Sequence, residues 1–247
     1  KRIEMDKMWV KMIKAALMDN RFRLLQQPIA SLSGEDTGMC DVVVRMIDEH
    51  NNEILPSEFL AAAERNDLMK NIDRWVIGSA MQFCSSRKIK QLFVRLSKDS
   101  VLDKSLPKWL ETQLAASRVN PERIVFEINE KIATEHLKNT VELSRLLHTT
   151  GFRFALEHAG NARDPKSLLQ HLQLDYLKFD GTLMQGLSLD IGLQERIQEL
   201  VSAARERKIR TIAERVEDAN TLAVLWQLGL ELIQGYFVHE PEQVVLG

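Results

Sequence analysis

The stretch that decides the fold is RIVFEINEKIATEHLKNTVELSRLLHTTGFRFALEH, residues 123–158. At each end lies a short apolar segment rich in β-branched or aromatic residues, which is typical of a buried strand. Between them, 130–148 has the apolar spacing of an amphipathic helix, with Asn129 placed to cap its start and Gly151 to end it. The stretch therefore predicts a strand–helix–strand unit, and such units place their strands parallel in one sheet.

The same alternation runs through most of the chain. Eight segments have the length and composition of strands: 22–29, 40–47, 91–97, 123–129, 152–158, 175–180, 210–215 and 230–237. Helical spacing fills the later gaps, at 66–87, 107–117, 130–148, 190–207 and 218–228. Eight strands separated by helices predict an α/β fold in which a parallel sheet closes into a (β/α)8 TIM-like barrel. A doubly wound open sheet is the alternative topology.

Composition narrows the class of protein. The 247 residues, 45% of them hydrophobic and 28% charged, can form one large barrel. The net charge of −2 lacks the basic excess that nucleic-acid or membrane-surface binding needs. Cys40 and Cys84 predict two reduced thiols of a cytosolic protein rather than a disulfide framework. No apolar run approaches the ~20 residues of a membrane span, so we expect no membrane insertion.

Residues 1–20 precede the first predicted strand and have the apolar spacing of a helix that ends at Asn20. The chain begins with Lys1 rather than Met. We therefore expect 1–20 to be a lead-in helix from an upstream region absent from this sequence, and 21–247 to form the barrel domain.

Long polar side chains gather where the predicted strands end, which is where barrels of this kind carry their chemistry. These residues are Gln27, Arg45, Arg95, Glu127, Glu157, His158, Lys178, Asp180, Glu214, Glu217 and Gln234. Buried charges are unfavourable unless they are paired or hold a ligand. We expect a site for a polar ligand, with a self-satisfied structural network as the alternative.

Seven short motifs carry a resemblance to a known family. They are QPI (27–29), SEFLAAAE (57–64), DRWVI (73–77), FEIN (126–129), LKFDGT (177–182), AERVED (213–218) and QGYF (234–237). In order and spacing the chain resembles the EAL family, barrel phosphodiesterases that linearise the bacterial second messenger cyclic di-GMP. It is most similar to the FimX/Filp branch, in which the EAL domain is degenerate. The resemblance implies that 21–247 is a degenerate EAL domain.

The family's chemistry uses two divalent metals, held by carboxylates and an amide, to activate a water. By the resemblance, Asp41 replaces the signature glutamate, Arg95 replaces a metal-binding asparagine, and Glu157 with His158 replaces the paired aspartates. A guanidinium has no lone pair to offer a metal, and imidazole suits a hard cation poorly. We expect no metal and no required cofactor, with Arg95 paired to Glu127 or Glu157 instead. The vestigial catalytic set is Asp41, Arg95, Glu127, Glu157, His158, Lys178 and Glu214.

An alternative role for Glu157 and His158 is to bind a zinc ion together. Neighbouring residues of a strand point to opposite faces of the sheet. We therefore expect that these two side chains do not bind one ion.

The resemblance also implies a set of residues that bind cyclic di-GMP: Gln27, Pro28, Val43, Arg45, Asp73, Arg215, Glu217 and Gln234. Arg45 matches an arginine placed against a phosphate, for which its fork is suited. Asp73 matches an acceptor for the guanine edge, and Arg215 stands where the branch has an aromatic residue that stacks on a base. The alternatives are an ion pair of Arg45 with Asp41 or Glu58, and a helix-surface position for Asp73.

The sequence thus predicts a catalytically inactive domain that binds cyclic di-GMP and signals through protein contact. The resemblance implies a PilZ-type adaptor as partner, in type IV pilus regulation and twitching motility, and a cytoplasmic bacterial protein that acts at the cell pole. One alternative is an active or weakly active cyclic di-GMP phosphodiesterase with altered metal ligands. The other is a barrel without ligand that serves as a scaffold.

Overall fold

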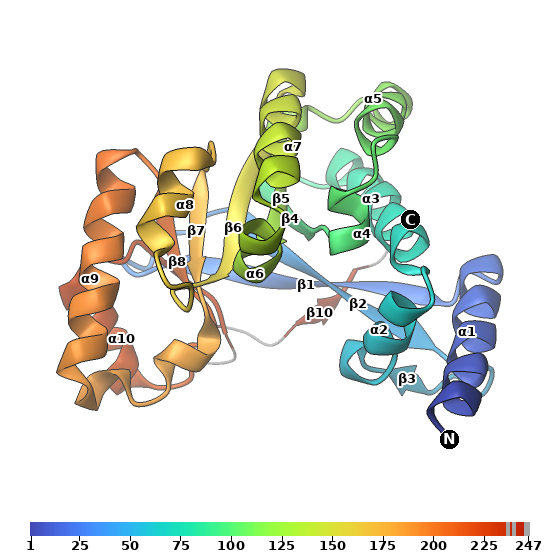
Figure 1. Cartoon of the computed structure of the whole chain (residues 1–247), viewed down its shortest axis with the longest axis horizontal. Coiled ribbons are helices and arrows are strands. Elements are labelled where there is room, and N and C mark those ends of the chain that lie inside the picture. Colours follow the sequence, from blue (N-terminus) through green and yellow to red (C-terminus); the bar gives the residue numbers. More distant parts are fainter. Residues whose placement is uncertain (236–237, 239–240, 245–247) are drawn as a thin grey trace.

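A closed ring of strands with helices packed around it forms the centre of the computed structural model, which describes residues 1–235, 238 and 241–244 (Figure 1). Around the ring the order is β1, β9, β8, β7, β6, β5, β4 and β2, and β2 pairs with β1 to close it. The strands are β1 Phe22–Ser31, β2 Met39–Ile47, β4 Gln91–Arg95, β5 Ile124–Asn129, β6 Arg153–Ala159, β7 Tyr176–Phe179, β8 Arg210–Ala213 and β9 Leu232–Ile233. The eight-stranded barrel is confirmed, and the open sheet is wrong. The predicted segment 230–237 corresponds to β9, while its residues 236 and 237 lie outside the described residues.

One strand departs from the expected parallel arrangement. β1 runs antiparallel to both of its neighbours, β2 and β9, whereas the other ring pairs are parallel. The chain between β1 and β2 spans residues 32–38, and a crossover to a parallel strand needs a dozen residues or more. The short connection therefore dictates a hairpin. Two further short strands, β3 Glu53–Ile54 and β10 Glu242–Gln243, extend the sheet beyond the ring.

The helices cover the outside of the barrel (Figure 1). They are α1 Arg2–Met18, α2 Pro56–Arg65, α3 Met69–Ser86, α4 Lys98–Val101, α5 Leu106–Ser117, α6 Glu130–Glu135, α7 Leu137–Thr150, α8 Pro165–His171, α9 Ile191–Glu206 and α10 Ala219–Leu228. The helix predicted over 130–148 is divided at His136, whose backbone leaves the helical region at φ −128° and ψ 49°. Its predicted ends are confirmed. Asn129 caps α6 by accepting the Lys131 N–H at 2.8 Å, and Gly151 ends α7 in the left-handed conformation.

Helix α1 packs directly against the barrel domain. Ile13 and Ala16 are fully buried in the main core. Near the start of the helix, the Asp6 carboxylate accepts two hydrogen bonds from the Arg65 guanidinium of α2, at 2.7 and 2.9 Å. The lead-in helix thus shares the domain's core, and a domain boundary at residues 20 and 21 stays a prediction.

The interior of the barrel is filled by one apolar layer. Each of the eight strands contributes a single side chain to it: Ile29, Met39, Phe93, Val125, Ala155, Tyr176, Ile212 and Leu232. Side chains alternate between the two faces of a strand. The residue two positions further toward the barrel mouth must therefore also point inward, above this layer.

Among the described residues, no helix combines the length and the apolar composition needed to cross a bilayer.

Candidate functional site

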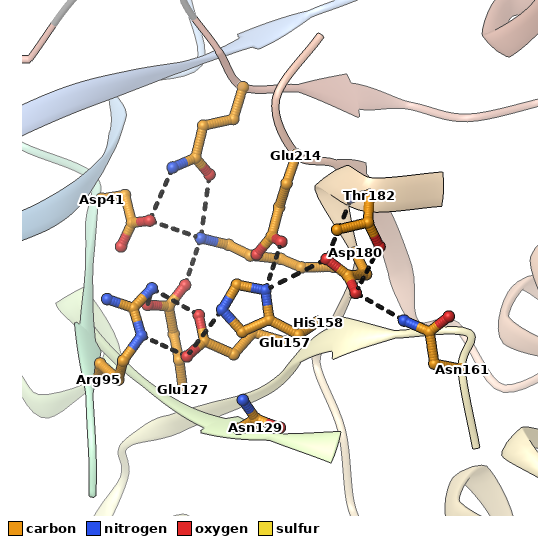
Figure 2. A network of polar contacts seen from close by, with 12 residues as sticks. Asp41, Arg95, Glu127, Asn129, Glu157, His158, Asn161, Asp180, Thr182 and Glu214 are labelled. Carbon is orange, nitrogen blue, oxygen red and sulfur yellow. Dashed lines mark hydrogen bonds and ion pairs between the residues drawn. The ribbon is translucent and has the colours of Figure 1, made fainter. Parts of the chain in front are cut away.

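A second inward-facing layer lies above the apolar one, and every member of it is polar. Its members follow the apolar layer by two positions in the parallel strands and precede it by two in the antiparallel β1. They are Gln27, Asp41, Arg95, Glu127, Glu157, Lys178, Glu214 and Gln234. All are buried except Arg95, whose side chain is 46% exposed. The structure thus brings six of the seven vestigial residues together across the barrel mouth, along with the predicted ligand residues Gln27 and Gln234. The seventh vestigial residue, His158, joins them through a bulge, and Figure 2 shows it beside Glu157 and Glu214.

Lys178 is the centre of one half of this polar layer. Its Nζ donates to Asp41 Oδ2 at 3.0 Å and to Gln234 Oε1 at 3.1 Å, and it also contacts Glu127 Oε1. Gln234 donates in turn to Asp41 at 2.7 Å and to Gln27 at 3.0 Å. Below, the ammonium lies 4.7 Å from the centroid of the Phe93 ring in the apolar layer. Lys178 therefore fixes both carboxylates from inside the barrel.

Arg95 occupies the other half of the polar layer. Its guanidinium donates to both oxygens of Glu157, with Nη2 at 2.6 Å from Oε2, and Nη2 lies 3.8 Å from Glu127 Oε2 (Figure 2). The expected pairing with Glu127 or Glu157 is confirmed for both residues. Because the pair with Glu157 is bidentate and charge-assisted, it belongs to the strong class of hydrogen bonds. Both Glu157 oxygens are thereby engaged.

His158 points to the same side as Glu157. The expectation that strand alternation turns these two side chains to opposite faces is therefore wrong. The pairing of β6 with β7 shifts register between Leu156 and Ala159, and His158 has a positive φ of 51°. Such a bulge interrupts the alternation of faces. The imidazole therefore enters the site, where Nδ1 lies 2.9 Å from Glu214 Oε2 and 3.7 Å from Asp180 Oδ1 (Figure 2).

The ionisation of these groups follows from their burial and their partners. Burial opposes ionisation of Asp41, but Lys178 and Arg95 lower its pKa to about 2. Burial and the nearby Asp41 raise the pKa of Glu127 well above its usual range, in spite of Lys178. Hydrogen bonding to Glu214 raises the pKa of His158 to about 9. At neutral pH the site therefore sets protonated His158 beside Arg95 and Lys178 as a third cation.

Glu157, His158 and Glu214 form the one described group whose ligand atoms, all within 4.8 Å of one another, could hold a metal ion. These ligand atoms already have partners in the protein, because Glu157 accepts from Arg95 and Glu214 pairs with His158. Asp41 Oδ1 and both Glu127 oxygens have no hydrogen-bond donor in the described part of the chain. The two Glu127 oxygens face Lys178 and Arg95 at ion-pair distance, and the other oxygen of Asp41, Oδ2, pairs with Lys178. A cation would have to displace a side-chain cation to enter.

Three of the other predicted ligand residues lie at the rim of the mouth. Val43 follows Asp41 on the inner face of β2 and is partly buried. Arg215 and Glu217 are exposed after β8, and the Arg215 stem covers Gly181 so closely that an added Cβ there would collide with it. Pro28 is placed differently, since alternation turns it to the face of β1 opposite Gln27.

Arg45 and Asp73 have partners that the sequence did not indicate. Arg45 pairs with Glu53 of β3, with Nε 3.0 Å from Oε1, so the expected alternatives Asp41 and Glu58 are wrong. Asp73 is 5% exposed, and one oxygen accepts from Ser97 N at 3.0 Å, Ser97 Oγ at 2.6 Å and Ser100 Oγ at 2.5 Å. A helix-surface position for Asp73 is therefore wrong. Its contact with a ligand stays a prediction.

Glu130, which the sequence did not indicate as a site residue, shapes the loop after β6. Its carboxylate is 3% exposed and accepts three consecutive backbone N–H groups, those of Gly160, Asn161 and Ala162, at 2.8, 3.1 and 2.7 Å. Asn161 then donates to Asp180 at 2.6 Å. An acidic residue in the first turn of a helix is common, so nothing in the sequence singles Glu130 out. A cavity of about 470 Å³ beside this loop is lined in part by His158 and Asp180.

Three comparisons bear on this site. The family model for the EAL domain matches residues 10–241. The chain is similar to the FimX EAL domain from Pseudomonas aeruginosa bound to c-di-GMP, at 36% identity and a TM-score of 0.90, covering 96% of this chain and 97% of that one. It is also similar to the Xanthomonas citri FimX EAL domain in complex with c-diGMP, at 27% identity and a TM-score of 0.90, covering 100% and 97%.

Two curated relatives are named as enzymes. Cyclic di-GMP phosphodiesterase PdeF of Escherichia coli is 28% identical over 240 residues, which are 94% of this chain and 32% of that protein. Cyclic di-GMP phosphodiesterase PdeB of Shewanella oneidensis is 29% identical over 239 residues, 95% of this chain and 28% of that protein. The chain thus spans about a third of the length of these relatives.

Proposed function

Since the chain belongs to the EAL-domain family, we propose that it is a receptor that binds cyclic di-GMP without cleaving it. The observation that carries this proposal is the bidentate bond of Arg95 to Glu157 in the polar layer. In the family resemblance this is where a metal-binding amide and a metal-binding carboxylate would stand. The Arg95 guanidinium stays protonated at all relevant pH values. It therefore permanently supplies the positive charge that a metal would otherwise bring to the carboxylate.

The residues present do not fit the two divalent metals that the family implies. A dication 4 Å from the Arg95 guanidinium would be repelled by about 8 kcal/mol at an effective dielectric of 20, twice the value for unit charges. Protonated His158 adds a second cation beside Glu157 and Glu214. These residues therefore do not support a hydrolytic step that depends on bound metal.

The proposed receptor binds the nucleotide through side chains and without these metals. The fixed cations Arg45 and Arg215 and the carboxylate Glu217 lie on the inner face of β2 or at the exposed rim after β8. They match the phosphate and base groups of a cyclic dinucleotide in charge and hydrogen-bonding type. The FimX EAL domains of P. aeruginosa and X. citri, to which the chain is similar, are complexes with this nucleotide.

A receptor without turnover needs another output, and we infer that it is a protein contact. The resemblance to the FimX branch implies a PilZ-type adaptor, with type IV pilus assembly and twitching motility as the process and the cell pole as the place. Cyclic di-GMP should then tighten or reshape the adaptor complex without being consumed. Co-purification of the chain with a PilZ-type protein, with and without the nucleotide, tests this output. Equal recovery in both states would contradict it.

A second candidate function is weak phosphodiesterase activity. Glu127, Lys178 and Glu214 persist in the polar layer, and the relatives PdeF and PdeB are named phosphodiesterases. The purified chain with Mg²⁺ or Mn²⁺ should nevertheless release no linear dinucleotide. Arg95→Asn alone should not restore turnover, because Glu157 and His158 still replace the ligands of the second metal. Product formed in proportion to protein would favour the enzyme, and absence of all binding would favour the scaffold.

Titration calorimetry with cyclic di-GMP, in EDTA and in Mg²⁺, decides between receptor and enzyme. We expect the two Kd values to agree within about twofold, or ~0.4 kcal/mol. Arg45→Ala should remove a charge-assisted contact and weaken binding about ten- to a hundredfold, while Arg45→Lys should recover part of it. Arg210→Ala, a strand arginine at the opposite end of the barrel, is the control. Binding that collapses in EDTA but tolerates Arg45→Ala would show that metals hold the ligand.

A further inference from the structure

The outer half of the β1–β2 hairpin extends above the barrel rim. β2 pairs with β4 through Met39–Asp41, whereas its pairing with β1 continues to Met46. Beyond the ring the hairpin reaches toward β3, α2 and α1 (Figure 1). Its inner face therefore continues the wall of the ligand site outward.

Two arginines lie directly opposite each other on this inner face. The inward positions Gln27 and Asp41 are cross-strand partners. Alternation makes Leu25 and Val43 the next inward pair and Arg23 with Arg45 the pair after that. Like charges directly opposite in a sheet are destabilising, so this pair calls for an anion on that face.

The described residues supply one carboxylate for these two guanidinium groups. Arg45 Nε lies 3.0 Å from Oε1 of Glu53, whose side chain is 55% exposed. Arg23 uses Nη1 for the backbone oxygens of Asn20 and Phe22, at 2.8 and 2.9 Å, and forms no ion pair with any described residue. No described residue accepts a hydrogen bond from Arg23 Nε, Arg23 Nη2 or Arg45 Nη2.

Glu53 is a weak partner compared with a phosphate diester. An ion pair with so exposed a member is screened by water and contributes little. A phosphate offers two oxygens to a guanidinium fork, and it can accept from two arginines at once. The anion that suits this face is therefore a phosphate group that reaches it from the site below.

We propose that Arg23 and Arg45 form one anion site for a phosphate of the cyclic dinucleotide, and that Glu53 is the counterion which this phosphate displaces. The inference rests on the proposed receptor function and deepens it. Arg23 becomes a specificity residue for an anionic ligand. Glu53 becomes a built-in competitor that lowers the affinity of the site.

Calorimetric titration of the chain with cyclic di-GMP in EDTA tests the role of Glu53. Glu53→Gln should tighten binding about two- to fivefold, because Arg45 no longer has to leave a carboxylate. The matched control is Glu231→Gln, since Glu231 pairs with Arg210 at the same Nε–Oε separation of 3.0 Å, near the start of β8. In the Arg45→Ala background, Glu53→Gln should have no effect, as expected when one residue acts through the other.

Arg23 is tested in the same titrations. Arg23→Ala should weaken binding about three- to tenfold and reduce its dependence on salt, and Arg23→Lys should recover part of the affinity. Arg153→Ala, at the start of β6 and paired with Glu122 at 3.3 Å, is the control. Unchanged thermal midpoints establish that the variants fold. If the wild type binds the nucleotide but Glu53→Gln and Arg23→Ala each show the same Kd as their control variants, this inference is wrong and the receptor function still stands. No binding by the wild type would remove both.

Discussion

Replacement of Arg95 by alanine is the most direct test of the idea that a side-chain cation stands where metals would bind. Removing one partner of a buried ion pair typically destabilises a protein by about 3–5 kcal/mol, because the other charge is left uncompensated. Glu157 is fully buried, but the Arg95 side chain is 46% exposed, so water can enter once it is gone. We therefore expect Arg95→Ala to lower the free energy of unfolding by about 2–3 kcal/mol at pH 7.5.

The pH dependence of this loss has a definite sign. Although burial opposes it, Arg95 lowers the pKa of Glu157 in the folded state. A lowered pKa contributes stability above the unfolded value of about 4.3, and that contribution is lost as pH falls through the folded pKa. In Arg95→Ala the largest contribution that lowers the pKa of Glu157 is gone, while His158 and Lys178 still lower it. The pKa should therefore be higher than in the wild type, so that protonation relieves the buried charge more readily as pH falls toward 5. The gap between wild type and variant should therefore be smaller at pH 5 than at pH 7.5.

Divalent metal supplies the second arm of the same experiment. Without the guanidinium, both Glu157 oxygens lose their donor and Glu127 Oε2 loses the cation beside it, and an ion that binds these oxygens stabilises the fold. Free Mn²⁺ at ten times its Kd would restore about 1.4 kcal/mol. Urea unfolding of both proteins, with EDTA or Mn²⁺, measures this, and Arg153→Ala is the surface control. Equal stabilisation of wild type and variant by Mn²⁺ would refute the reasoning, as would a gap that does not change with pH.

Two further predictions concern residues outside the ligand contacts. Glu130→Gln should leave part of the N–H cluster of Gly160–Ala162 without an acceptor. Amide hydrogen exchange there should therefore rise about tenfold or more, as for a loss of about 1.4 kcal/mol. Glu135→Gln is the exposed control, and unchanged exchange in Glu130→Gln would show that the loop is stable without this carboxylate. His148 lies between two acceptors, the Ser144 carbonyl and Asp175, both at 2.8 Å, and although burial opposes it, Asp175 raises the pKa of His148. Its contribution to stability is complete below pH ~6.5 and should be lost as pH rises through the raised pKa. In His148→Gln the urea unfolding midpoint should therefore change less between pH 6 and 9 than in the wild type. An equal decrease of the midpoint in both proteins would contradict this.

The barrel could be predicted because its signal is local and repeated. A short apolar run indicates each strand of the ring, and the eight runs coincide with β1, β2 and β4–β9. The direction of β1 was missed, although the residues between 31 and 39 are too few for a crossover. The division of the helix at His136 left no comparable trace in the apolar spacing.

The polar layer could also be predicted, because position along a strand fixes both depth and face. The failures came where that rule is interrupted or where the partner is remote. A bulge turned His158 inward, and alternation alone cannot reveal a bulge. Glu53 lies on a strand of two residues that carries almost no sequence signal. Asp73 is buried by Ser97 and Ser100, which follow a different strand.

The polar layer can be understood as a problem of charge balance inside an apolar barrel. Carboxylates at Asp41, Glu157 and Glu214 would repel one another at this depth without cations between them. Arg95, Lys178 and His158 supply three positive charges, and burial favours the neutral form of Glu127. Side chains thus balance the layer from within the chain. In the proposed receptor, the phosphates of the ligand must then find their cations above the layer, on the hairpin face that Arg45 occupies, rather than in metals at the barrel mouth.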